Sequence, residues 1–256
     1  MKGTPMRTIL AALILLAGAT LARAEPIHDA AQAGDLATVK KLLAESPFLR
    51  KALDPGGRTP ATIAAGAGRI EVVEYLLSTG VSVKDANPDG RTMLHAACDG
   101  GKYEMVKLLV TKYRAPLGVA DAQGWQPIHF ACRKDPVDML RLLIDQKADV
   151  NAQSKPGATP LIMATSMKMK AQVALLIERR ADANKADSWN RTPLHVAAKN
   201  KDKAMVEMLL KAGGRVGGKD KDGKSALDEA VAAGATDIIP LLEKAIGPTL
   251  KTNRKK

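Results

Sequence analysis

The chain has 256 residues, of which 46% are apolar, 26% charged and only 3% aromatic. This composition excludes a disordered polypeptide, a collagen-like fibre and a disulfide-stapled miniprotein, and so few aromatic residues do not suit a β-sandwich or β-barrel of this length. Of the net charge of +12, residues 1–24 contribute +3 and the last six residues +4, which leaves +5 for residues 25–250. We therefore do not expect nucleic acid as a partner.

Residues 1–24 have the three-part pattern of a secretory signal peptide. Lys2 and Arg7 precede an uninterrupted run of small and apolar residues, 9–22, and the segment ends in Ala22-Arg23-Ala24. Small residues at the first and third positions before the cut favour cleavage after Ala24. The apolar run is shorter than the roughly 20 residues of a membrane-spanning helix. We expect export without membrane insertion; a buried N-terminal helix is the alternative.

The chain from residue 25 to about 247 is an internal repeat. Each unit begins with a four-residue motif, continues through a small pair such as Ala64-Ala65, and closes with an apolar segment that in most units holds paired leucines. The motifs are Glu25-Pro26-Ile27-His28, Thr59-Pro60-Ala61-Thr62, Thr92-Met93-Leu94-His95, Gln126-Pro127-Ile128-His129, Thr159-Pro160-Leu161-Ile162, Thr192-Pro193-Leu194-His195 and Ser225-Ala226-Leu227-Asp228. They are 33 or 34 residues apart. This pattern predicts seven helix-turn-helix units that bury their apolar faces by stacking.

Turn and cap residues recur in the same register. Glycine precedes most motifs at a position where we expect a positive φ, and asparagine takes that position once. These residues are Gly57, Gly90, Gly124, Gly157, Asn190 and Gly223. In the fourth repeat, Asp135-Pro136 predicts an N-cap followed by proline at the first helical position.

These residues resemble the ankyrin-repeat family, whose consensus runs Asp-x-x-Gly-x-Thr-Pro-Leu-His-x-Ala-Ala before an outer helix. The segment Thr192–Ala198 is close to a perfect copy. The resemblance covers residues 25–247 and implies an all-α ankyrin-repeat solenoid with short hairpin fingers. The basic residues 248–256 are then a flexible tail. A tetratricopeptide array has a similar period, but it needs bulky aromatic positions that this chain lacks.

No catalytic, cofactor-binding or metal-binding residues are indicated. His28, His95, His129 and His195 share the fourth motif position, where the resemblance implies hydrogen bonds to the backbone between adjacent turns. One histidine per repeat gives a spacing of about 8–10 Å, which is too wide for a shared zinc ion. We also find no nucleophile beside a spare histidine, no glycine-rich phosphate loop and no paired carboxylates. We therefore expect neither an enzyme nor a cofactor.

The two cysteines, Cys98 and Cys132, occupy the same position in consecutive repeats. Stacked helices at about 8–10 Å exceed the Cα separation of roughly 4.4–6.8 Å that a disulfide requires. We expect small buried thiols that stay reduced.

Two tryptophans depart most clearly from the repeat pattern. Trp125 follows the turn residue Gly124, and Trp189 precedes Asn190. Both positions belong to hairpin fingers that are expected to project into solvent. Tryptophan is enriched among interface hot spots, so both residues are candidates for partner contact. Packing onto a neighbouring finger is the alternative.

A second set of candidates follows the small pair of each repeat, at variable positions that face the concave groove in the ankyrin family. In repeats four to six these candidates are Arg133, Lys134, Met167, Lys199 and Asn200. Together they predict a basic, partly apolar patch, flanked by Trp125 and Trp189, that suits an acidic partner surface. An ordinary solvated surface is the alternative, and Met167 also suits the protein core.

The resemblance implies a protein-protein interaction module, monomeric when unbound. The chain looks like exported bacterial ankyrin-repeat proteins with a cleavable signal peptide, and this resemblance implies an inhibitor, guard or immunity partner of an exported enzyme. We therefore expect a periplasmic inhibitor or self-protection partner of an envelope enzyme such as a cell-wall hydrolase, with an acidic contact surface on that enzyme. The alternative is a secreted effector that binds a host protein.

Overall fold

The computed structural model describes residues 26–134 and 136–246. Within these ranges the chain consists of helices and turns, and its β pairing is one isolated bridge between Ala86 and Thr92. The predicted all-α repeat architecture is therefore confirmed. The predicted signal peptide, its cleavage site, the basic tail and Asp135 lie outside the described residues.

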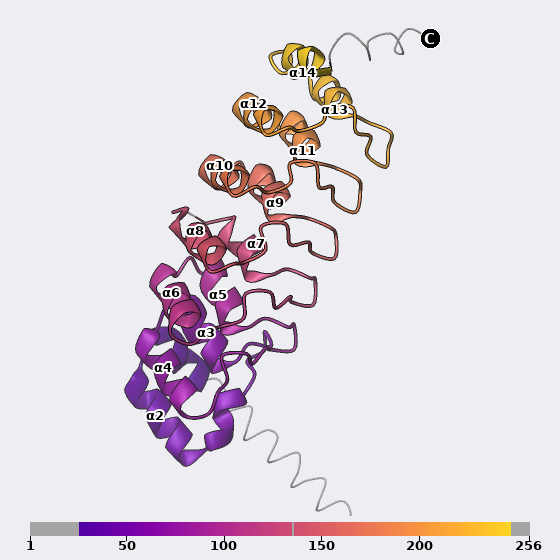
Figure 1. Cartoon of the computed structure of the whole chain (residues 1–256). Helices are drawn as coiled ribbons and strands as arrows, with labels where there is room; N and C mark the ends of the chain where they lie inside the picture. Colours follow the sequence, from indigo (N-terminus) through magenta and orange to yellow (C-terminus); the bar gives the residue numbers. More distant parts are fainter. Residues whose placement is uncertain (1–25, 135, 247–256) are drawn as a thin grey trace, which may run out of the picture. The chain divides into compact units, whose positions relative to one another are not determined.

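The chain divides into two compact units between Ala115 and Pro116. The first unit holds a helix at residues 26–33, followed by α2 (Leu36–Glu45), η1 (Pro47–Lys51), α3 (Pro60–Ala67), α4 (Ile70–Ser78), α5 (Met93–Asp99) and α6 (Tyr103–Thr111). The inner helices α3 and α5 pack against each other, and each packs against the outer helix that follows it (Figure 1).

The second unit contains repeats four to seven. Its helices are α7 (Pro127–Ala131), α8 (Asp138–Asp145), α9 (Pro160–Ser166), α10 (Lys170–Glu178), α11 (Pro193–Lys199), α12 (Lys203–Lys211), α13 (Ala226–Ala233) and α14 (Ile239–Ile246). The inner helix α9 packs between α7 and α11, and α11 also packs against α13. Each inner helix is preceded by a hairpin finger (Figure 1).

The motif residues explain where the inner helices begin. Thr159 and Thr192 have extended backbone and act as N-caps, and proline follows each at the first helical position. Proline costs nothing there because its missing N–H would have no partner inside the helix. In repeat seven, Asp228 replaces histidine and still completes a capping box with Ser225.

The core repeats with the same period as the sequence. An alanine at the same position of every inner helix is fully buried, which lets neighbouring helices approach closely. These are Ala31, Ala64, Ala97, Ala131, Ala164, Ala197 and Ala230. One leucine of each outer helix is buried behind them: Leu43, Leu76, Leu109, Leu143, Leu176, Leu209 and Leu242. Stacking of repeats within each unit therefore builds the apolar interior.

The predicted first residue of the outer helix after Asp135, Pro136, was wrong. The outer helix α8 begins at Asp138, with Val137 as its N-cap, so Pro136 precedes the helix. In repeat five the outer helix begins six residues after the buried Ala164, at Lys170. The same spacing from Ala131 gives residue 137, whose backbone is already helical. The repeat register therefore falls one residue before the observed start of α8, and the local cap signal falls two residues before it.

Candidate functional site

A buried polar side chain holds each finger of the second unit in shape. Asp121 Oδ1 accepts the backbone N–H groups of Gln123 and Trp125, both at 2.9 Å. Asp187 Oδ1 does the same for Trp189 and Arg191 at 2.9 Å. In each of these two fingers, one carboxylate accepts both turn N–H groups and thereby fixes the backbone at the tryptophan. Sequence reasoning missed these aspartates, although the first residue of the consensus motif marks them.

Neighbouring fingers are tied together by backbone hydrogen bonds. The Lys155 N–H donates to the Gln123 carbonyl at 2.9 Å, and the Ser188 N–H donates to the Pro156 carbonyl at 2.9 Å. The Lys221 N–H bonds the Trp189 carbonyl at 3.0 Å. The fingers of repeats four to seven therefore form a connected row.

The turn residues of the fingers have the predicted positive φ. It lies between 60° at Asn190 and 78° at Gly124 in the six fingers. At Gly157 a Cβ atom would also lie 2.6 Å from the Ser188 nitrogen. Glycine is therefore required there both by the backbone conformation and by the neighbouring finger.

Trp125 is more enclosed than the sequence suggested. Its ring is half-buried and meets the His129 ring edge-on, with centroids 5.2 Å apart and planes at 79°. The side chain therefore contacts α7 of its own repeat. Trp125 therefore supports the base of its own repeat.

Trp189 is exposed, as predicted. About 51% of its surface is accessible, and the guanidinium of Arg191 lies 4.9 Å from the ring centroid. Asp187 Oδ2 holds that guanidinium at 2.7 Å, so one buried carboxylate fixes both the cation and the Trp189 backbone. A large apolar ring is thus presented to solvent in a defined position.

The remaining predicted residues lie near the C-terminal ends of inner helices. Arg133 and Lys134 are half-buried, and the Arg133 guanidinium lies 5.5 Å from the Phe130 ring centroid. The Lys134 carbonyl accepts a 2.7 Å hydrogen bond from the buried Gln172. Met167 is 50% exposed in the turn after α9.

The predicted patch therefore occupies two places in the second unit. The finger residues precede the inner helices, whereas Lys199 ends α11 and Asn200 is its C-cap. A seven-residue helix at 1.5 Å per residue is about 10 Å long, and α11 has this length. Lys199 is exposed and Asn200 half-buried. We distinguish a finger site, centred on Trp189, from a turn site, centred on Met167.

The motif histidines make the backbone bridges that the sequence predicted. His129 Nδ1 accepts the Gln126 N–H at 3.0 Å, and Nε2 lies 3.2 Å from the carbonyls of Ala152 and Ala158 in the next finger. Because an N–H group can only donate, Nε2 carries the proton. Burial lowers the pKa of His129, although hydrogen bonds to Ala152 and Ala158 oppose it, so the ring is neutral. His195 repeats this arrangement.

Neither cysteine is arranged for reactivity. Cys98 and Cys132 are fully buried and are not joined by a disulfide. Burial raises the pKa of the Cys98 thiol far above its ordinary value. In the described ranges, no group of three or more His, Cys, Asp and Glu side chains is arranged to hold a metal ion.

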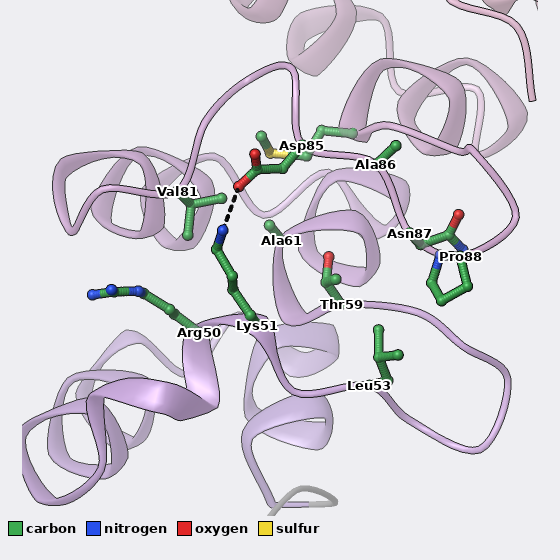
Figure 2. Close-up of a pocket in the computed structure, with 11 residues that line it drawn as sticks. Arg50, Lys51, Leu53, Thr59, Ala61, Val81, Asp85, Ala86, Asn87 and Pro88 are labelled. Carbon is green, nitrogen blue, oxygen red and sulfur yellow. Dashed lines mark ion pairs between the residues drawn. The ribbon is translucent and has the colours of Figure 1, made fainter.

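The first unit contains a pocket of about 410 Å³ beside η1 and the finger that precedes α5 (Figure 2). Its walls include Leu53, Val81 and the cations Arg50 and Lys51. Arg50 donates to the Thr79 carbonyl at 3.3 Å, and Lys51 lies 3.6 Å from Asp85. Because both cations already have partners, the pocket offers little charge to orient a ligand.

Comparison with known proteins agrees with the fold. Models of ankyrin repeats match residues 27–119, 114–187 and 168–252. Inversin of Gallus gallus is 32% identical over 148 residues, which are 57% of this chain and 13% of inversin. Alpha-latrocrustotoxin-Lt1a of Latrodectus tredecimguttatus is 26% identical over 129 residues, 50% of this chain and 9% of the toxin. Human protein phosphatase 1 regulatory subunit 27 is 38% identical over 90 residues, 35% of this chain and 58% of that protein.

This chain spans only a small part of the first of these relatives. None of the helices in the described ranges has the length and hydropathy of a membrane-spanning segment. The matching family is one of protein-binding modules, and no catalytic family is indicated. With matched segments across nearly all of residues 27–252, the chain belongs to the ankyrin-repeat family and is a protein-protein interaction module.

Proposed function

We propose that the chain is an exported inhibitor or immunity partner that binds an envelope enzyme through its second unit. The observation that carries the proposal is Trp189, a large apolar side chain that is exposed but held by Arg191 and Asp187. A positioned aromatic ring loses little conformational freedom on binding, which is typical of interface anchors. The turn site adds a basic surface that complements acidic groups on the enzyme.

We propose export because residues 1–24 have the pattern of a signal peptide. We propose an enzyme as the partner because the chain resembles exported ankyrin-repeat proteins. One similar protein is by name a regulatory subunit of a phosphatase. An ankyrin scaffold does not itself determine its partner, so the identity of the enzyme has to be measured.

The experiment begins with the mature chain, residues 25–256, as bait in a periplasmic extract. A captured protein supports the proposal when it is an exported enzyme whose activity falls as the purified chain is added in stoichiometric amounts. The Trp189→Ala variant should capture less of it. The matched control is Val231→Ala, which truncates another exposed apolar side chain, in repeat seven.

Intact-mass measurement of the native protein tests export in the same preparation. A mature N-terminus at Glu25 is expected. A periplasmic chain that retains residues 1–24 would contradict cleavage, and recovery from the culture medium with a host protein as partner would favour the secreted effector.

A further inference from the structure

In repeats one to three and five to seven, the inner and outer helices are joined by a turn in which one residue has a positive φ. In repeat five this residue is Lys168, whose N–H donates to the Thr165 carbonyl at 3.1 Å. The next N–H, of Met169, donates to the Ala164 carbonyl at 2.9 Å. This pair of bonds is the Schellman motif. Lys201 takes the same place in repeat six.

Glycine is the residue that this turn favours, because it has no Cβ to crowd the following carbonyl. Repeats one, two, three and seven have glycine there: Gly34, Gly68, Gly101 and Gly234. Lys168 and Lys201 instead have φ values of 58° and 55°. Repeats five and six therefore hold lysine at a position where it strains the backbone.

The outer helix of repeat five begins against a second local preference, whereas the outer helix of repeat six keeps an acidic N-cap, Asp202. The first turns of α4, α6 and α8 contain Glu71, Glu104 and Asp138, which suit the positive end of the helix dipole. The first turns of α10 and α12 contain no acidic residue, and the helices begin with Lys170 and Lys203. A cation is unfavourable at this end of a helix.

Together with Lys199, these residues make five cations, which we call the inner-turn lysines: Lys168, Lys170, Lys199, Lys201 and Lys203. All five are exposed. Among the described residues, no carboxylate forms an ion pair with any of them. Asp202 lies among them, but its carboxylate caps α12 through the Met205 N–H at 3.1 Å.

The opposite ends of the outer helices are different. Lys147 and Arg180 also have positive φ, at 76° and 63°, in turns with the same backbone bonds. Acidic residues flank them closely in the sequence, among them Asp145, Asp149 and Asp182. The attraction of a cation to a helix C-terminus therefore explains a basic residue in either kind of turn. It does not explain why the five cations around the inner turns have one acidic neighbour, Asp202, whose carboxylate is engaged as the N-cap of α12.

The two inner turns lie beside each other, because they follow the packed helices α9 and α11. Met167, half exposed, belongs to the first turn. Unfavourable local choices that coincide in one place are expected at functional sites. We propose that the inner-turn lysines dock an extended acidic segment of the protein partner, with an apolar residue of that segment covering Met167. This inference rests on the proposed function and specifies the chemistry of its turn site.

The test uses the mature chain and a fluorescent synthetic peptide that repeats Glu-Glu-Leu, at low salt. The double variant Lys168→Gly and Lys201→Gly should weaken peptide binding by about tenfold, because two of the five cations are lost. The same variant should unfold at a temperature about 2–4 °C higher, because backbone strain is removed. A lower unfolding temperature would show that the lysines serve the fold and would overturn the proposal.

Lys147→Gly with Arg180→Gly is the matched control. It removes two cations from positive-φ positions of the outer turns, so it should raise the unfolding temperature while leaving peptide affinity unchanged. Equal loss of affinity in the control would attribute binding to net charge and overturn the proposal. A single-stranded DNA oligonucleotide of equal charge should bind more weakly than the peptide. Equal or tighter binding would identify a general polyanion surface instead.

The captured enzyme separates this inference from the proposed function. If the peptide binds as expected but no exported enzyme is captured, the proposed function fails while the docking chemistry stands. If an enzyme is captured and inhibited, but the Lys168→Gly and Lys201→Gly variant binds it as the original chain does, the docking inference fails alone.

Discussion

The guanidinium of Arg191 covers one face of the Trp189 ring at 4.9 Å, and the buried Asp187 holds that guanidinium at 2.7 Å. Cation–π contact and ion pair thus act on the same finger. The ring is restrained before any partner arrives, and its other surface remains open to solvent. Trp125, two fingers earlier, has the opposite arrangement, because its ring is packed onto His129.

Truncation of Trp125 should therefore affect stability. Trp125→Ala removes a half-buried ring and its edge-to-face contact with His129. Such an aromatic contact stabilises the folded state by about 0.5–1.5 kcal/mol beyond the contribution of the buried area. We expect the free energy of unfolding in urea to fall by roughly 1–3 kcal/mol. Trp189→Ala, measured alongside, should change it by less than about 0.5 kcal/mol. Equal effects of the two substitutions would contradict the different packing of the two rings.

The close approach of two fingers at Gly157 can be measured against a matched glycine. Gly157 and Gly223 have nearly the same φ, 76° and 75°, but a Cβ at Gly157 meets the Ser188 nitrogen at 2.6 Å while one at Gly223 meets nothing within 4 Å. Gly223→Ala should cost about 1–2 kcal/mol of stability for its left-handed backbone alone. Gly157→Ala should cost more, because the adjacent finger has to move. Equal losses in chemical denaturation would show that the fingers are not in contact.

The buried His129 predicts a loss of stability in mild acid. Its pKa is lower in the folded chain than the ordinary value of 6.5, chiefly because of burial. Below about pH 6.5 the unfolded chain binds a proton at His129 that the folded chain excludes. The contribution of His129 to the free energy of unfolding is therefore fully present above about pH 6.5 and is lost as the pH falls below it. Urea unfolding on either side of that pH should show a smaller decline for His129→Gln than for the original chain. The same decline in both would mean that His129 does not contribute.

The two cysteines should both titrate as thiols. Each is fully buried, and each lies at the same place in its repeat. Thiol titration of the purified chain, denatured without a reducing agent, is expected to detect both groups. Detection of neither, with a mass lower by two hydrogens, would demonstrate a disulfide and would overturn the spacing that the repeat pattern assumes.

Much of the fold follows from the sequence because each local signal recurs in at least four of the seven repeats. The buried alanine, the paired leucines, the motif histidine and the finger glycine all occupy the positions that the period predicts. The start of α8 does not, because the helix begins at Asp138, one residue after the position given by the repeat register and two residues after the Pro136 of the local cap signal. A local signal found once is weaker than a signal supported by its neighbours.

The candidate site was predicted less completely, because the direction of a side chain depends on tertiary contacts. Sequence placed Trp125 and Trp189 together on projecting fingers, but Trp125 turns onto His129. It also grouped Lys199 with the fingers, whereas Lys199 lies at the far end of α11. The strain at Lys168 and Lys201 became visible only from the φ angles.

The central claim is that the second unit binds an exported enzyme through Trp189. It is tested most directly by the dissociation constant of the captured enzyme for the mature chain and for Trp189→Ala. Hot-spot tryptophans cost about 2 kcal/mol or more on truncation, so we expect Trp189→Ala to raise the dissociation constant by about thirtyfold, mainly through faster dissociation. An unchanged dissociation constant for Trp189→Ala, with the chain folded, would show that Trp189 is not the anchor of the interface.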